Sequence, residues 1–343
     1  MVFALARAEL RRAHEVSMEL LRLSQARGRQ ARLQANLAVG MTLSFLGEFA
    51  DARDYLERAV SLYDPARYHW PAYSYLEDPT VAALAHLAHV LWRMGYPDQA
   101  LSTAEKAIGL AREFDHPYSI AYALCLEVLV SQLRGEPERM LQLADTALAI
   151  SHERGFKLPD AVATIFRGFA LAELGQAAEG LALSIKGLDA LAATGVQIFL
   201  SRYLGLLGRM RLHAGSPEQA LEDLARALAH VSASEEHCNE AELRRLVGQA
   251  MLRQPPPSCL EAITWFDQAV TVARKQNARS DELRILTDLC RLEQARPVSQ
   301  RRDKLMEVYH SFGEGFGTTD LRIARSLIEQ WPYTFHKLTQ GEP

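Results

Sequence analysis

Leu174-Gly175-Gln176-Ala177-Ala178-Glu179-Gly180 is the stretch around which this sequence is organised. Within it, a Gly closes one helical pattern and a second helical pattern opens at once. Related copies occupy Leu46–Ala52 and Met94–Ala100, and weaker ones begin at Gly135 and Gly215. Gly ends a helix readily because it tolerates a positive φ. Each copy is therefore predicted to be a tight turn between two helices.

The glycines of these copies follow a regular spacing. They stand at positions 47, 95, 135, 175 and 215, so that successive glycines are 48, 40, 40 and 40 residues apart. Small residues recur seven positions before each glycine and five and twelve positions after it, with Val128 and Met140 as exceptions. Extending the spacing to both ends adds anchors at 8, 257 and 296.

This spacing is typical of antiparallel helix pairs. Helix axes pack ~8–10 Å apart, and small residues at a crossing allow the shorter distance. One such hairpin buries little apolar surface, so successive hairpins stack into a solenoid. Gly168 and Gly208 are predicted to lie at tight crossings, where Leu would overpack the interface and Ala would cost little.

The pattern resembles the tetratricopeptide repeat, whose usual length is about 34 residues. A second resemblance is carried by the longer repeat and by five phrases, Leu62–Pro65, Glu77–Pro79, Leu91–Ala100, His116–Ala123 and Glu314–Leu321. Together they resemble the sensor region that follows the ATPase module in bacterial adenylate/guanylate cyclase-type regulators, which belong to the signal-transduction ATPase family. The resemblance covers nearly the whole chain, although the ATPase and cyclase modules have no counterpart in it.

We predict an all-α fold, a right-handed superhelix of antiparallel helix pairs that forms a tetratricopeptide-like solenoid of about 40-residue repeats. Asp78 is expected to cap the helix that starts at Pro79. The array is expected to begin part-way through a repeat, as it would in a fragment of a longer protein or in a chain with a mis-set start. One array is expected over residues 1–336, with an extra loop at 64–79, a closing helix at about 319–331 capped by Thr319, and a tail at 337–343.

Composition argues against several functional classes. A net charge of −4 over 343 residues gives no basic field for a phosphate backbone, so no nucleic-acid partner is expected. No stretch approaches ~18 uninterrupted apolar residues, so no membrane partner is expected either. The four cysteines lack CxxC spacing, and a reduced cytoplasmic setting is predicted. The oligomeric state is left open.

Catalytic, cofactor and metal motifs are missing. The sequence contains no GxxxxGK[ST], HExxH or GxSxG. Gly313–Gly317 is rich in Gly but follows no strand, and is interpreted as a flexible joint. His86 and His89 share a helix face without a third ligand nearby, so one buried and one groove-facing histidine are expected. The chain is predicted to be no enzyme and to hold no cofactor and no metal.

The concave groove is the main candidate binding site. The resemblance to tetratricopeptide proteins places the first helix of each pair on this face, with groove positions 13, 10, 6, 3 and 2 residues before each anchor. Several guanidinium groups around one concavity would concentrate positive potential and favour an acidic peptide or an anionic metabolite. The alternative is that these residues are ordinary solvated side chains. The predicted contact residues are His89, Trp92, Arg93, Tyr122, Gln132, Arg202, Arg209 and Arg244.

The aromatic insertion is a second candidate. Arg67, Tyr68, Trp70 and Tyr73 are predicted to lie at the rim of the groove, unless these rings simply pack on the adjacent repeat. The favoured function is a non-catalytic module that binds a protein, a peptide or an anionic small ligand, as the sensor or partner-docking region of a bacterial signalling ATPase or cyclase-type regulator. The alternative is a stand-alone scaffold for protein–protein assembly.

Overall fold

The computed structural model describes residues 1–64, 77–292 and 299–330. Over these residues it contains helices and no strand, which confirms the predicted all-α solenoid. The described residues do not include the predicted tail or the predicted rim residues Arg67, Tyr68, Trp70 and Tyr73.

The helices of the described residues follow one another in this order: α1 (Val2–Ala6), α2 (Leu10–Ser24), α3 (Arg29–Leu46), α4 (Phe49–Ser61), α5 (Pro79–Arg93), α6 (Pro97–Glu113), α7 (Pro117–Arg134), α8 (Pro137–Arg154), α9 (Lys157–Glu173), α10 (Ala177–Ala193), α11 (Leu200–His213), α12 (Pro217–Ser234), the 3-10 helix η1 (His237–Asn239), α13 (Glu240–Arg253), α14 (Cys259–Lys275), α15 (Arg279–Leu292), α16 (Ser299–His310) and α17 (Thr319–Glu329).

The turns within and between helix pairs use left-handed backbone. All five anchor glycines have a positive φ, from 75° to 94°, as the repeat pattern predicts. The turns between successive pairs adopt the same conformation at Asp115, Gly155, Gly195 and Glu235. These four positions are also 40 residues apart, a second register that the small-residue pattern did not predict.

The two predicted helix caps have different outcomes. Asp78 Oδ1 accepts from the backbone N–H groups of Thr80 (2.8 Å) and Val81 (3.1 Å), so the predicted cap of α5 is confirmed. The prediction for α17 was wrong, because Thr318 rather than Thr319 holds the N-cap position. The Thr318 hydroxyl donates to the Gly315 carbonyl oxygen (2.7 Å) and so stabilises the preceding turn instead.

The crossing of α9 and α10 brings backbone against backbone. A Cβ atom at Gly168 would lie 2.4 Å from Ser184 Oγ and 2.5 Å from the carbonyl oxygen of Gly180. The crossing at Gly168 is therefore tight, as expected. The expectation that Ala would be tolerated there is wrong, because a backbone carbonyl cannot rotate away. At Gly208 the same atom would meet Leu224 Cγ at 3.0 Å, and that side chain has some freedom to adjust.

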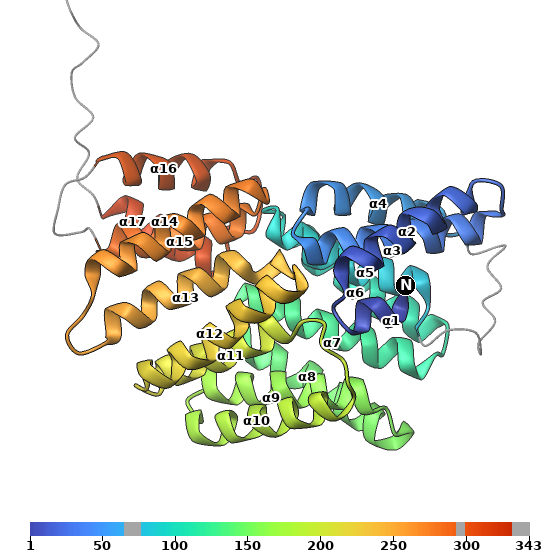
Figure 1. Cartoon of the computed structure of the whole chain (residues 1–343), viewed down its shortest axis with the longest axis horizontal. Helices are drawn as coiled ribbons and strands as arrows, with labels where there is room; N and C mark the ends of the chain where they lie inside the picture. The colour runs from blue at the N-terminus through green and yellow to red at the C-terminus, as the bar shows by residue number, and fades with distance from the viewer. Residues whose placement is uncertain (65–76, 293–298, 331–343) are drawn as a thin grey trace, which may run out of the picture.

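The array curves until early helix pairs touch late ones. Helix α5 contacts α15 and α3 contacts η1, and Figure 1 shows the N-terminal helices beside the C-terminal ones with α8–α12 below them. The Ser280 hydroxyl donates to the carbonyl oxygen of Trp92 (2.6 Å), and the Arg284 guanidinium lies 4.7 Å from the Trp92 ring centroid. Side chains of an early and a late helix therefore meet in the interior of the array.

A second closing contact joins two of the phrases singled out in the sequence. Glu314 Oε1 accepts from the backbone N–H groups of Asp98 and Gln99, both at 3.0 Å. The Gly315 N–H donates to Asp98 Oδ2 (2.8 Å). Glu314 thus caps the N-terminus of α6, whose own N-cap residue Tyr96 makes no side-chain cap hydrogen bond, at a position where negative charge is favourable. Gly313–Gly317 therefore contacts the start of α6 and is not only the flexible joint that the sequence predicts.

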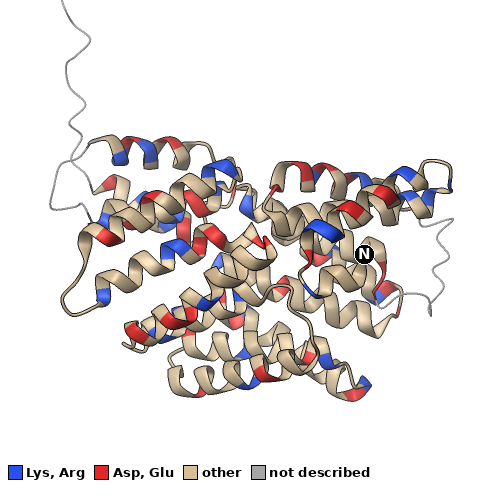
Figure 2. Ribbon diagram, viewed as in Figure 1, with Lys and Arg blue, Asp and Glu red and all other residues tan. Residues whose placement is uncertain are grey.

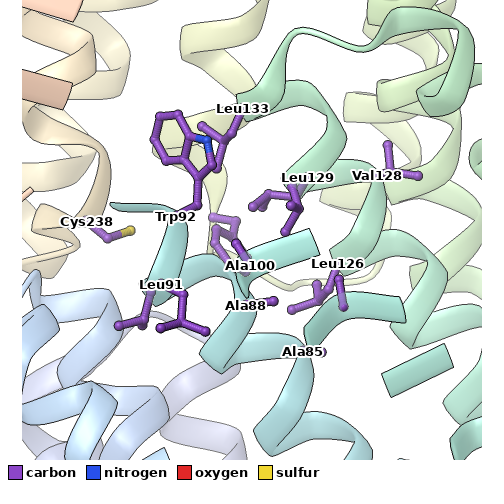
Figure 3. Packing of buried hydrophobic residues seen from close by; sticks show 14 of the residues in the cluster. Ala85, Ala88, Leu91, Trp92, Ala100, Leu126, Val128, Leu129, Leu133 and Cys238 are labelled. Carbon is purple, nitrogen blue, oxygen red and sulfur yellow. The ribbon is translucent and has the colours of Figure 1, made fainter. Parts of the chain in front are cut away.

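The buried apolar residues form two clusters. One apolar cluster extends from α1 to α17 and a smaller one lies among α11, α12 and α13. Figure 3 shows Trp92 of α5 in the larger cluster with Leu129 and Leu133 of α7. Charges of both signs are interspersed along the outer helices α2, α4 and α16 (Figure 2). Within the described ranges, no helix has the length and apolar character to cross a membrane.

Candidate ligand-binding site

Three of the predicted groove residues meet in the interior of the closed array. His89, Arg93 and Arg202, together with Asn239 and Asp281, form what we call the buried polar cluster, and each of these residues is at most 5% exposed. Arg93 Nη1 lies 2.6 Å from Asp281 Oδ2, and Arg93 Nη2 donates to Asn239 Oδ1 (2.7 Å). Closure of the solenoid therefore gathers these residues and also covers them.

His89 is neutral in this cluster. Its Nε2 atom lies 3.3 Å from Arg93 Nε and 3.1 Å from Arg202 Nη2. Guanidinium nitrogens only donate, so Nε2 must accept, and the ring proton resides on Nδ1. Burial, and then the charges of Arg93 and Arg202, hold the pKa of His89 well below its ordinary value. The structure thus places both His86 and His89 in the interior, and the expectation of one groove-facing histidine is wrong.

Arg202 carries a charge that its neighbours do not balance. Its Nη1 atom donates to Gln132 Oε1 (3.3 Å), and its Nε atom has no hydrogen-bond partner. Among the residues that the structure describes, no carboxylate lies within 4 Å of this guanidinium. Burial, and then the charge of Arg93, lower the pKa of Arg202 to about 10. The cluster therefore holds two guanidinium groups, Arg93 and Arg202, and the single carboxylate of Asp281.

A basic funnel opens beside the cluster. Its volume is about 350 Å³, and its wall comes from the C-terminal ends of α7 and α11, from α13 and α15, and from the start of α17. We use the name basic funnel for this cavity and its charged lining residues, Arg209, His213, Arg245, Arg253, Arg284, Arg291, Asp288 and Asp320, with Gln132, Gln249, Thr287 and Thr319 as polar neighbours. Arg253 and Arg291 are exposed, whereas Arg245 is buried.

Ion pairs hold the deeper arginines in place. Arg245 binds Glu242 through Nε (2.7 Å) and Nη2 (2.8 Å), and Arg284 Nε lies 2.7 Å from Asp320. Arg209 Nη2 lies 2.8 Å from Glu173. The five arginines and two aspartates of the lining leave a formal charge of about +3, which falls to about +1 when Glu173 and Glu242 behind the wall are included. The funnel is thus cationic in a chain of net charge −4.

The structure places Arg244 outside the funnel. Its guanidinium pairs with Glu240 (2.6 Å) and donates to Gln268 of α14 (2.7 Å). The cause is a register error. Helix α11 ends two residues before its anchor, but α13 ends at Arg253, four residues before the assumed anchor at 257.

Moving that anchor to Pro255 corrects the register of α13. The joint between α13 and α14 is two residues longer than the joint between α11 and α12. Counting back from 257 therefore shifted every predicted groove position of α13 by two residues. The groove positions 13, 10 and 6 residues before 255 become Glu242, Arg245 and Gln249. Arg245 and Gln249 line the funnel, and Glu242 lines the small cavity beside it.

The sequence analysis also missed the contribution of α15. Asp281, Arg284, Asp288 and Arg291 recur at steps of three and four along this helix, which places them on one face. That spacing was available as a signal. Arg284, Asp288 and Arg291 line the funnel, and Asp281 belongs to the buried polar cluster.

The remaining predicted residues have structural contacts of other kinds. Trp92 is 2% exposed and packs in the core. The Tyr122 hydroxyl lies 2.8 Å from His86 Nε2. Gln132 joins the two features, because it accepts from Arg202 and also lines the funnel. Over the described ranges, no group of three potential metal ligands is found. The binding roles of all these residues stay predictions.

Comparisons with known proteins support the architecture. The tetratricopeptide repeat family matches residues 33–64 and 81–114, so the chain carries such repeats. No curated protein sequence matches the chain significantly.

Solved structures of Rap proteins are similar to this chain in fold. A Rap protein complexed with competence and sporulation factor has a TM-score of 0.57 and 14% identity, over 78% of this chain and 76% of that one. The Rap conjugation gene regulator of plasmid pLS20, in complex with the Phr* peptide, has a TM-score of 0.57 and 12% identity, over 88% and 75%. Aspartyl phosphate phosphatase F from Bacillus subtilis has a TM-score of 0.51 and 12% identity, over 94% and 77%. At these identities the likeness concerns the fold alone.

Proposed function

We propose that this chain is a non-catalytic helical-repeat module that binds an acidic peptide, or an acidic segment of a protein, at the basic funnel. The observation that carries the proposal is the convergence of Arg209, Arg245, Arg253, Arg284 and Arg291 from three helices on one cavity of about 350 Å³. Guanidinium groups bind carboxylates in bidentate fashion, and a concave site strengthens their field.

We infer different tasks for the arginines from their contacts. Arg209, Arg245 and Arg284 are held by Glu173, Glu242 and Asp320, so they provide a preorganised wall. Arg253 and Arg291 are exposed at the mouth, and Arg291 lies no closer than 3.9 Å to Asp288. These two side chains are therefore the ones that can pair with an incoming carboxylate without losing an existing short ion pair.

Two of the structurally similar Rap proteins are complexed with a competence and sporulation factor and with a Phr* peptide, which supports a peptide or protein as the partner here. The resemblance to the repeat region of cyclase-type regulators supports a role as the sensor or docking region of a signalling ATPase in the bacterial cytoplasm. An anionic small molecule is a weaker candidate, because the funnel opens widely and offers several separated guanidinium groups.

The proposal is tested with a cellulose-bound peptide array, followed by fluorescence anisotropy with the peptide that the array selects. We expect peptides rich in Asp and Glu to be enriched. Arg253→Glu combined with Arg291→Glu should weaken the selected peptide at least 10-fold, about 1.4 kcal/mol or more. The matched control is Arg22→Glu combined with Arg58→Glu on the outer helices α2 and α4. Equal affinities of the funnel variant and the control variant would refute the proposal.

A further inference from the structure

A small cavity lies between the buried polar cluster and the basic funnel. Its volume is about 20 Å³, room for one or two groups the size of a water molecule. Gln132, Arg209 and Arg284 line both this cavity and the funnel, so the two spaces adjoin. Arg202 and Asn239 complete its polar side toward the buried polar cluster.

The donors around this cavity are incompletely satisfied. Arg202 Nε and Arg284 Nη1 are buried and have no hydrogen-bond partner. Both belong to residues that line the cavity. A buried donor without an acceptor destabilises the fold, and does so more strongly when it is charged. Two such donors in residues that line one small cavity indicate that an acceptor occupies the cavity.

Charge indicates that this acceptor is an anion. The cavity is lined by three arginines, Arg202, Arg209 and Arg284, and by one carboxylate, Glu242. Glu242 is committed to Arg245 through two hydrogen bonds of 2.7 and 2.8 Å. Arg209 and Arg284 have their own carboxylates, but Arg202 has only the neutral partners His89 and Gln132. Water would satisfy the donors and leave the Arg202 charge unbalanced.

We infer that this cavity is a binding site for one small monovalent anion, held chiefly by Arg202 and Arg284. The size of the space admits chloride or the two oxygens of a carboxylate, and excludes a phosphate ester with its full set of oxygens. The anion is either a free ion or the terminal carboxylate of a larger ligand that enters through the funnel. In both cases guanidinium groups bind an anion. A free ion could bind whether or not the funnel binds a peptide, so that case does not depend on the proposed function.

The test measures thermal unfolding of the full chain at constant ionic strength. The bulky sulfonate of HEPES is replaced stepwise by chloride, by formate and, as a mimic of a peptide end, by N-acetylglycine. We expect a saturable rise in Tm of about 2–4 °C for at least one of these anions. A rise with chloride or formate alone identifies a free ion. A rise that includes N-acetylglycine, but not N-acetylglycinamide, identifies a chain-terminal carboxylate.

Variants assign the effect to the cavity. Arg202→Met removes the unbalanced charge at similar volume and should abolish the rise in Tm. Arg134→Met is the matched control, because Arg134 is 10% exposed in its side chain, is paired with Glu136 and is not among the residues that line the cavity. It should keep the full anion response. If Arg202→Met fails to fold, Arg202→Lys should shift the half-saturating anion concentration at least threefold.

Two results would overturn the inference. One is a wild-type chain whose Tm is the same in all the anions tested. The other is an Arg202 variant that responds to them as the wild type does. Loss of peptide binding at the funnel mouth in the Arg253→Glu and Arg291→Glu variant leaves the free-ion response unchanged, so failure of the proposed function and failure of this site are distinguishable.

Discussion

Arg93 Nη1 and Asp281 Oδ2 lie 2.6 Å apart in the interior, although 188 residues separate them in the sequence and each side chain is only 1% exposed. This contact joins α5 to α15 and so connects an early repeat to a late one. In an open solenoid each repeat touches only its neighbours. Here an early and a late repeat stabilise one another, and unfolding of either repeat exposes a buried charge.

Asp281→Asn is therefore expected to destabilise the fold by ~3–5 kcal/mol, because it leaves the guanidinium of Arg93 buried without a counter-charge. Equilibrium unfolding in urea measures the change. The control is Glu329→Gln, which breaks the pair between Arg325 and Glu329, whose side chains are 65% and 59% exposed. That exposed pair should contribute less than about 1 kcal/mol. A loss below about 1 kcal/mol for Asp281→Asn, as expected for the exposed pair, would contradict the stabilising role of the closing contact.

Gly168→Ala is expected to destabilise the chain by ~1–3 kcal/mol through overpacking against Gly180 and Ser184. This loss should appear even though Ala favours a helix by ~1 kcal/mol over Gly. Gly208→Ala is the comparison, because its new Cβ meets the adjustable side chain of Leu224. Its effect should be clearly smaller. The reverse order of the two urea midpoints would contradict the backbone contacts described for α9 and α10.

His86 should make stability depend on pH. Burial lowers its pKa to about 4 from an ordinary value of 6.5, so between these values the unfolded chain binds more protons than the folded chain. Unfolding free energy should then fall as the pH drops below about 6.5, by about 2 kcal/mol from this group at pH 5. His86→Gln should reduce the fall between pH 7 and pH 5. Replacement of the exposed His310 by Gln is the control and should leave the slope unchanged.

Glu173→Gln should strengthen binding at the funnel. The Glu173 carboxylate lies 2.8 Å from Arg209 and 3.3 Å from His213, two residues of the funnel wall. Although burial opposes its ionisation, His213 and Arg209 lower the pKa of Glu173, so it is charged near neutral pH. Removing this negative charge should tighten an acidic peptide about 3- to 10-fold, or roughly 1 kcal/mol. Fluorescence anisotropy measures the affinity, and the exposed Glu153→Gln is the control. Weaker binding by Glu173→Gln would indicate that Arg209 needs its partner for correct orientation.

The local features of this fold were predictable from the sequence because they repeat and depend on near neighbours. The Gly at each anchor marks a left-handed turn, and small residues at fixed offsets mark helix crossings. The groove offsets also identified Arg202, Arg209 and Gln132 correctly as inward-facing. The error in α13 arose at the Pro255–Pro257 joint, where two additional residues shifted the count and selected Arg244 in place of Arg245.

Only the tertiary structure decided how far the array curves. Curvature is the sum of small rotations between successive repeats, and no single repeat encodes that sum. It brings Asp281 to Arg93, Glu314 to the N-terminus of α6, and Arg284 to Trp92. The same closure converts a predicted open groove into a buried polar cluster with a basic funnel beside it. Sequence periodicity indicated several of the residues that face inward, and long-range packing determined which of them are covered.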